Sequence, residues 1–171
     1  MEICELAKMI PQEEVNQKLS YGCSELELDF LGFEDLYRAV SKIVPLDWTI
    51  VDLGCYQAAQ CYFFRDHEKY IGVDSYDEIT SYRYVPPLRF KSENTEHYVC
   101  NIERYFRVYD RGKYRDANTY FIASAVPTYP VKDLMDKTEN FAWWYPGESV
   151  VTGGYKNAEI KQLAEKYLGE K

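Results

Sequence analysis

The stretch Thr49–Asp77, TIVDLGCYQAAQCYFFRDHEKYIGVDSYD, decides the fold of this chain. Its first five residues, Thr49–Leu53, form an apolar run whose β-branched members predict a buried strand. Gly54 follows at once and permits a sharp turn close to a ligand. Tyr56–Arg65 has neither Pro nor Gly and predicts a helix, and the apolar run Tyr70–Val73 predicts a second strand. The stretch therefore predicts one βαβ unit.

Two carboxylates stand at the ends of these predicted strands. Asp74 lies 20 residues after Gly54, about the distance at which a nucleotide-binding fold offers a carboxylate to ribose hydroxyls. It is equally compatible with a turn acid in Asp74–Asp77. Asp52 either approaches a ligand or caps the helix that follows, where a negative charge is favoured.

The same residues resemble the Rossmann-like S-adenosylmethionine (SAM)-dependent methyltransferases. Val51–Cys55 looks like the start of the first motif of that family, and Gly72–Ser75 looks like the end of its second strand. The resemblance implies that the first loop passes under the methionine part of SAM and that the acid after the second strand binds ribose. Asn101–Ile102 is a weaker match to the strand end that contacts adenine in the family.

The resemblance implies SAM as the cofactor and a set of cofactor-binding residues, but no catalytic residue. Methyl transfer needs little more than correct placement of a nucleophile, so no general base is required. The family usually has two further glycines after the first, and here Tyr56 and Ala58 or Ala59 stand in their places. The implied cofactor-binding residues are Asp52, Gly54, Cys55, Tyr56, Asp74, Ser75, Asn101 and Ile102.

The rest of the chain predicts an α/β fold with strands and helices in alternation. We expect a Rossmann-like, doubly wound, methyltransferase-like domain over 1–171, with an N-terminal helical segment (1–45) and a mainly parallel core of about five strands (46–171). The antiparallel hairpin that completes the family's sheet is expected to be missing. Further strands are predicted at Tyr98–Cys100, Thr119–Ala125 and Phe141–Tyr145, and helices at Glu34–Val44, Ile102–Tyr109, Val131–Asn140 and Lys156–Leu168.

Three other segments have open interpretations. Met1–Lys18 predicts two helical pieces, and Leu26–Phe30 predicts either a short strand or an extended connector. Glu78–Glu96 predicts a long loop. Its basic and aromatic residues either grip a planar or anionic ligand or pack as an ordinary solvated loop.

Composition limits the function classes. The net charge of -8 argues against nucleic acid and anionic membranes as partners. The 5 cysteines form no CxxC pair, and they and the 2 histidines show no metal-ligand spacing, which favours free thiols in a cytoplasmic protein without a metal. The 17 tyrosines suit interfaces and ligand walls, so the expected partners are a small-molecule or protein substrate, with a homodimer as the candidate assembly.

Three functional hypotheses follow. The first is a SAM-binding, methyltransferase-like protein with weak activity or none. The second is a non-catalytic, degenerate Rossmann-like module for interaction or assembly, in which Tyr56 fills the cofactor pocket. The third is an α/β enzyme of another type that uses Cys55 as a nucleophile, which the sequence disfavours because neither His67 nor His97 has a readable relation to Cys55.

Overall fold

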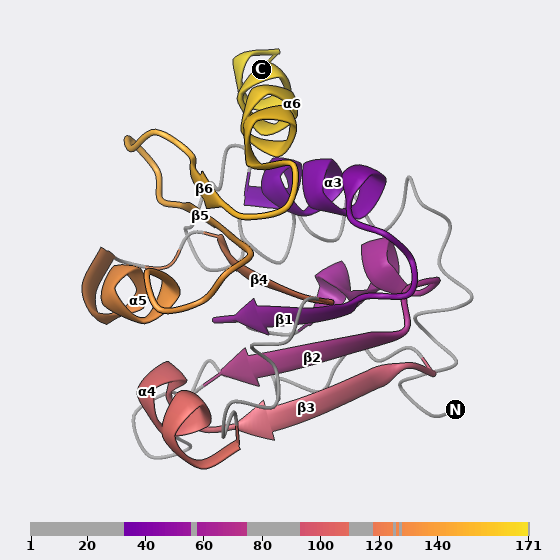
Figure 1. Cartoon of the computed structure of the whole chain (residues 1–171), viewed down its shortest axis with the longest axis vertical. Coiled ribbons are helices and arrows are strands. Elements are labelled where there is room, and N and C mark those ends of the chain that lie inside the picture. The colour runs from indigo at the N-terminus through magenta and orange to yellow at the C-terminus, as the bar shows by residue number, and fades with distance from the viewer. Residues whose placement is uncertain are drawn as a thin grey trace.

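The structure of the protein, a computed structural model, is an α/β arrangement built on one six-stranded, mostly parallel sheet (Figure 1). It describes residues 33–55, 58–74, 93–109, 118–124, 126 and 128–170. The described elements in chain order are α3 (Phe33–Ile43), β1 (Thr49–Leu53), the 3-10 helix η1 (Ala59–Phe64), β2 (Lys69–Asp74), β3 (Thr95–Val99), α4 (Ile102–Arg104), the π-helical turn η3 (Tyr105–Tyr109), β4 (Thr119–Ser124), α5 (Thr128–Met135), β5 (Phe141–Trp144), β6 (Val151–Gly153) and α6 (Asn157–Gly169).

The strand order is β3-β2-β1-β4-β5-β6, and β1 to β5 all run parallel. The chain leaves β1 toward β2 on one side and returns to β4 on the other, so the strand order reverses beside β1. In open α/β sheets, ligands bind at the carboxyl ends of the strands at such a reversal. The arrangement is compatible with a Rossmann-like fold.

Side chains of the parallel strands alternate between two apolar layers, as the period of two in a β-strand requires. Along β1, Ile50 faces the layer formed with α3, η1 and α6, whereas Val51 and Leu53 face the layer formed with η3 and α5. Both faces of the sheet are thus covered by helices (Figure 1). The turns at the strand ends are therefore where the described part of the sheet can meet a ligand.

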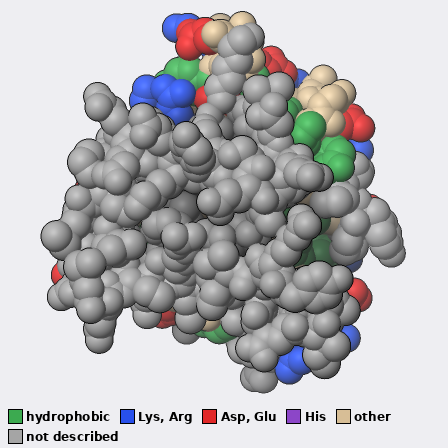
Figure 2. Space-filling view, turned by 180° about the vertical axis from the view of Figure 1, so that it is seen from behind, with side chains coloured by type: hydrophobic (Ala, Val, Ile, Leu, Met, Phe, Trp, Pro, Cys, Tyr) green, Lys and Arg blue, Asp and Glu red, His purple; other side chains and the backbone are tan. Residues whose placement is uncertain are grey.

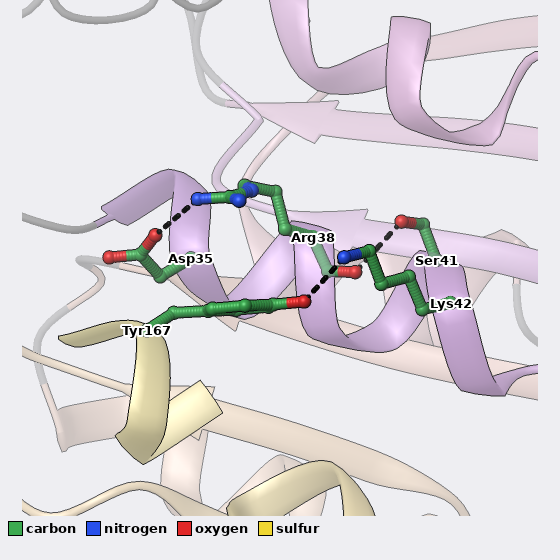
Figure 3. Close-up of polar contacts among 5 residues, drawn as sticks. All are labelled: Asp35, Arg38, Ser41, Lys42 and Tyr167. Atoms are coloured by element: carbon green, nitrogen blue, oxygen red, sulfur yellow. Dashed lines mark hydrogen bonds and ion pairs between the residues drawn. The ribbon is translucent and has the colours of Figure 1, made fainter. Parts of the chain in front are cut away.

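The helices α3 and α6 are joined by a cluster of polar and aromatic side chains (Figure 3). The guanidinium carbon of Arg38 lies 4.5 Å from the centre of the Tyr167 ring, and Lys42 Nζ lies 5.0 Å from it. Lys42 Nζ also donates to the Tyr167 hydroxyl at 2.5 Å, and Arg38 pairs with the buried Asp35 at 3.2 Å. One aromatic ring on α6 therefore binds two cations on α3.

Replacement of Tyr167 by leucine is expected to lower the free energy of unfolding by about 1 kcal/mol. A leucine keeps most of the apolar contact but loses the cation–π contact with Arg38 and the hydrogen bond from Lys42 to the hydroxyl, each worth roughly half a kcal/mol or more. Urea unfolding measures the change. Tyr167→Phe is the control, because it loses the hydroxyl that binds Lys42 but keeps the ring under Arg38. Equal losses in Tyr167→Leu and Tyr167→Phe would contradict a role for the ring face.

Three sequence predictions need correction. The segment after β1 is a 3-10 helix over Ala59–Phe64, shorter than the predicted Tyr56–Arg65, and it starts after Ala58 in a left-handed conformation (φ 58°). The helix predicted at Val131–Asn140 instead spans Thr128–Met135. The sheet has an antiparallel strand beside β5, although a C-terminal hairpin was expected to be missing. This strand, β6, has only three residues, Val151–Gly153, and all three are half-buried, so no alternation of apolar and polar residues marks it in the sequence.

The remaining predicted strands and the helices α3 and α6 are confirmed within a few residues. The helix predicted at Ile102–Tyr109 consists of α4 followed directly by the π-helical turn η3. The predictions for Met1–Lys18 and Leu26–Phe30, and most of the predicted loop Glu78–Glu96, lie outside the described residues.

Within the described ranges, no helix has the length and apolarity that a membrane crossing requires. Seen from behind, described acidic and basic side chains are interspersed around the edge of the molecule (Figure 2).

Candidate functional site

The candidate site lies at the carboxyl ends of β1, β2 and β3, where the parallel strands bring Gly54, Asp74 and Asn101 to one edge of the sheet. The chain turns tightly after β1, because the backbone N–H groups of Gly54 and Cys55 both donate to the Val73 carbonyl, at 2.7 and 3.0 Å. Gly54 has a φ of 78°, in the region that favours glycine. The predicted glycine turn beside an acid-bearing strand is confirmed.

Asp52 is fully buried on the α3 side of β1, and both of its carboxylate oxygens are bound by side chains. The Tyr37 hydroxyl donates to Oδ1 at 2.8 Å, and Gln60 Nε2 donates to Oδ2 at 2.7 Å. The Tyr70 hydroxyl donates to the same Oδ2. The carboxylate therefore joins α3, η1 and β2 beneath the turn, which is neither of the two roles that the sequence suggested for it.

Burial dominates the electrostatics of this cluster. It raises the pKa of Asp52 from 3.8 to about 6, although hydrogen bonds from Tyr70, Tyr37 and Gln60 act in the opposite direction. Burial also raises the pKa values of Tyr37 and Tyr70 well above 10, and the Asp52 charge adds to the effect. Both phenols consequently keep their protons near neutral pH and serve as donors to Asp52.

Cys55 is buried and faces His97 of β3, with 3.2 Å between Sγ and Nε2. The two side chains meet over Gly72, where an added Cβ would lie 2.9 Å from Cys55 Sγ and 3.1 Å from His97 Cδ2. Burial, reinforced by the charges of Asp52 and Asp74, raises the pKa of the Cys55 thiol well above 9.0. A buried thiol that keeps its proton is a poor nucleophile, so the pair is a structural thiol–imidazole contact.

The other predicted residues occupy the ends of β2 and β3. Asp74 is the half-buried last residue of β2, and its carbonyl accepts from Cys100 N at 2.9 Å. Asn101 is exposed, and its Oδ1 accepts from Arg104 N at 2.7 Å, which caps α4. Ile102 is the first residue of α4 and packs against the apolar layer on that face.

Val126, just beyond β4, packs against Gly54 from the other side of the strand-order reversal. A Cβ on Gly54 would lie 2.5 Å from Val126 Cγ2. Trp143 on β5 fixes this contact, because its Nε1 donates to the Val126 carbonyl at 3.0 Å. Part of the space beside the turn is thus filled by an apolar side chain.

Sequence reasoning missed Gln60, His97, Tyr37 and Tyr70 as neighbours of the turn. The relation of His97 to Cys55 depends on the pairing of His97 with Gly72 across β2 and β3, a register that only the folded sheet defines. The one available signal was glycine at position 72 inside an apolar strand, which often marks a close approach.

Tyr56 and Ser75 lie outside the described residues. Among the residues that the structure does describe, no group of three or more His, Cys, Asp or Glu side chains could hold a metal ion. Comparisons with protein-family models, curated proteins and solved structures found no match.

Proposed function

We propose that this chain is a methyltransferase-like protein that binds SAM at the turn after β1, with Gly54 and Asp74 as its principal contacts and a small molecule or a protein as substrate. The observation that carries the proposal is the pairing of a left-handed glycine turn with the carboxylate that ends the neighbouring parallel strand. When bound, SAM supplies an electrophilic methyl group. The protein's part is to hold the cofactor so that a nucleophile can approach that group in line.

The hydrogen bonds already made by the backbone N–H groups of the turn favour a ligand that is a nucleoside without phosphates. Phosphate-binding turns present N–H groups to the anion. Here the N–H groups of Gly54 and Cys55 are both used by the Val73 carbonyl. The carboxylate of Asp74 would repel a phosphate but can accept hydrogen bonds from ribose hydroxyls. Together these features favour a ligand such as SAM over nucleoside phosphates and dinucleotides.

Isothermal titration calorimetry tests the proposal with S-adenosylhomocysteine and SAM, and with ATP and NAD⁺ as phosphate-bearing controls. We expect heat and a thermal shift with the first two ligands and neither response with the controls. The absence of both responses to SAM and S-adenosylhomocysteine at millimolar concentration would reject the proposal.

Replacement of Asp74 by asparagine is expected to weaken S-adenosylhomocysteine binding by about 10- to 100-fold. The charge-assisted hydrogen bonds to ribose hydroxyls contribute roughly 1.5–3 kcal/mol each, and an amide recovers part of that. Asp66→Asn is the matched control, because Asp66 is an exposed acid that precedes the opposite end of β2. Equal dissociation constants for Asp74→Asn and Asp66→Asn would exclude a ribose contact at Asp74.

A second candidate is the non-catalytic interaction module, and the packing of Val126 on Gly54 favours it. If this side chain blocks the site, Val126→Ala creates S-adenosylhomocysteine binding that the wild-type protein lacks. If the site already admits the ligand, wild-type and Val126→Ala proteins bind it with similar affinity. Calorimetry on this pair therefore separates the two candidates.

A further inference from the structure

Gln60 is a buried amide, 4% exposed, on the short helix η1 beneath the turn. Its side-chain nitrogen donates to Asp52 Oδ2 at 2.7 Å and to the Cys55 carbonyl at 2.8 Å. The two hydrogens of an amide NH₂ group are sufficient for these two bonds. One nitrogen atom thus connects a buried carboxylate in β1 to the backbone of the turn that follows it.

Every polar group of Cys55 is engaged by a different element. Its N–H donates to the Val73 carbonyl of β2, its carbonyl accepts from Gln60 Nε2 of η1 and from the Ala58 N–H, both at 2.8 Å, and its Sγ lies 3.2 Å from His97 Nε2 of β3. Of these contacts, the one from Gln60 links the turn to a buried carboxylate, because the same nitrogen donates to Asp52 Oδ2.

The cost of losing this contact falls on the turn itself. Without the amide, the Cys55 carbonyl keeps the Ala58 N–H as a donor but loses its side-chain donor, and the turn loses its link to Asp52. The turn can relieve that cost by opening toward solvent, since it lies at the strand ends. Opening would also release the N–H groups of Gly54 and Cys55 from Val73.

We infer that Gln60 is a positioning residue: it holds the Gly54–Cys55 turn in the closed shape in which both N–H groups are bound to Val73. Closure keeps these donors away from a ligand and so determines that the turn accepts a nucleoside and rejects a phosphate. The statement about ligand choice rests on the proposed function, whereas the statement about the shape of the turn does not.

Amide hydrogen exchange followed by NMR tests the shape of the turn in the protein without ligand. The reporters are the amides of Gly54 and Cys55, and the reference is the amide of Phe121 in β4, which donates to the Asn140 carbonyl. In Gln60→Leu we expect the two reporters to exchange about tenfold faster relative to Phe121, as the loss of about 1.4 kcal/mol predicts. Gln162→Leu, at an exposed glutamine of α6, should leave this ratio unchanged.

Unchanged exchange in Gln60→Leu, or equal acceleration of the reporters and Phe121, would overturn the inference. Gln60→Glu keeps it testable if Gln60→Leu does not fold. A glutamate at this position can donate only when it is protonated. The exchange ratio of Gln60→Glu should therefore be closer to that of the wild type at about pH 5 than at about pH 8, and a ratio that does not change with pH contradicts the inference.

Calorimetry with S-adenosylhomocysteine and ATP tests the choice of ligand. Gln60→Leu should bind S-adenosylhomocysteine about tenfold more weakly than the wild type does, while its affinity for ATP does not fall. Equal S-adenosylhomocysteine affinity in the two proteins would overturn the role in ligand choice. If the wild type binds no S-adenosylhomocysteine, the proposed function fails, and the exchange measurements still decide whether Gln60 shapes the turn.

Discussion

Between about pH 4 and pH 7, the wild-type protein is expected to lose about 2 kcal/mol of unfolding free energy relative to an Asp52→Asn variant. Burial raises the pKa of Asp52 from 3.8 to about 6 in the folded protein. Between these values the folded state holds a proton that the unfolded state has released, so stability falls as the pH rises. At about 1.4 kcal/mol for each pKa unit, the full shift corresponds to about 3 kcal/mol, of which roughly 2 kcal/mol is lost between pH 4 and pH 7.

Urea unfolding at several pH values measures this difference, because an asparagine at position 52 cannot titrate. Carboxylates that do not interact with Asp52 contribute equally to both proteins and cancel in the comparison, whereas Asp74, whose charge raises the pKa of Asp52, does not. Parallel stability curves for the wild type and Asp52→Asn from pH 4 to pH 7 would show that the buried carboxylate is stabilised as well as it is in water.

Replacement of Gly54 by alanine is expected to lower the free energy of unfolding by about 3 kcal/mol. A non-glycine residue in the left-handed region costs roughly 1–2 kcal/mol, and Gly54 has a φ of 78°. The new Cβ would also lie 2.5 Å from Val126 Cγ2, an overlap that adds about 1–3 kcal/mol. Chemical denaturation of the purified variant measures the sum.

Two further variants separate these contributions. Gly147 also has a positive φ, of 87°, but a Cβ there would meet no atom within 4 Å, so Gly147→Ala measures the conformational cost alone. The double variant Gly54→Ala/Val126→Ala removes the overlap and should recover about half of the loss. Equal destabilisation by Gly54→Ala and Gly147→Ala would mean that Val126 moves away without cost.

The β1–turn–β2 geometry could be predicted because local signals agree there. The apolar runs before Gly54 and before Asp74 have the composition of buried parallel strands, and one glycine stands where the chain must turn. The parallel pairing of Leu53 with Val73 follows from the right-handed connection expected between such strands. The edge formed by Gly54 and Asp74 was therefore readable from the sequence.

The surroundings of Asp52 and Cys55 could not be predicted, because they depend on contacts between residues far apart in the chain. Tyr37 reaches Asp52 from a helix 15 residues earlier, and His97 reaches Cys55 from a strand 42 residues later. The acid at the end of β1 looks like a ligand contact or a helix cap in isolation. Only the packing of α3 against the sheet reveals it as a buried acceptor of hydrogen bonds.

Val126 illustrates a further limit of sequence reasoning. The Val126 side chain sits against Gly54, and Trp143 in the next strand donates to the Val126 carbonyl. The space available beside the turn is thus set by residues from β4 and β5 as well as by the turn itself. This is why the glycine motif alone does not determine whether a ligand fits.

A crystal structure of the protein soaked with S-adenosylhomocysteine tests the central claim most directly. We predict that the ribose hydroxyls bind the Asp74 carboxylate and that the ligand passes close to the Gly54 backbone. The N–H groups of Gly54 and Cys55 should remain hydrogen-bonded to the Val73 carbonyl. A ligand bound elsewhere, or a turn that opens and leaves Asp74 without a hydroxyl partner, would contradict it.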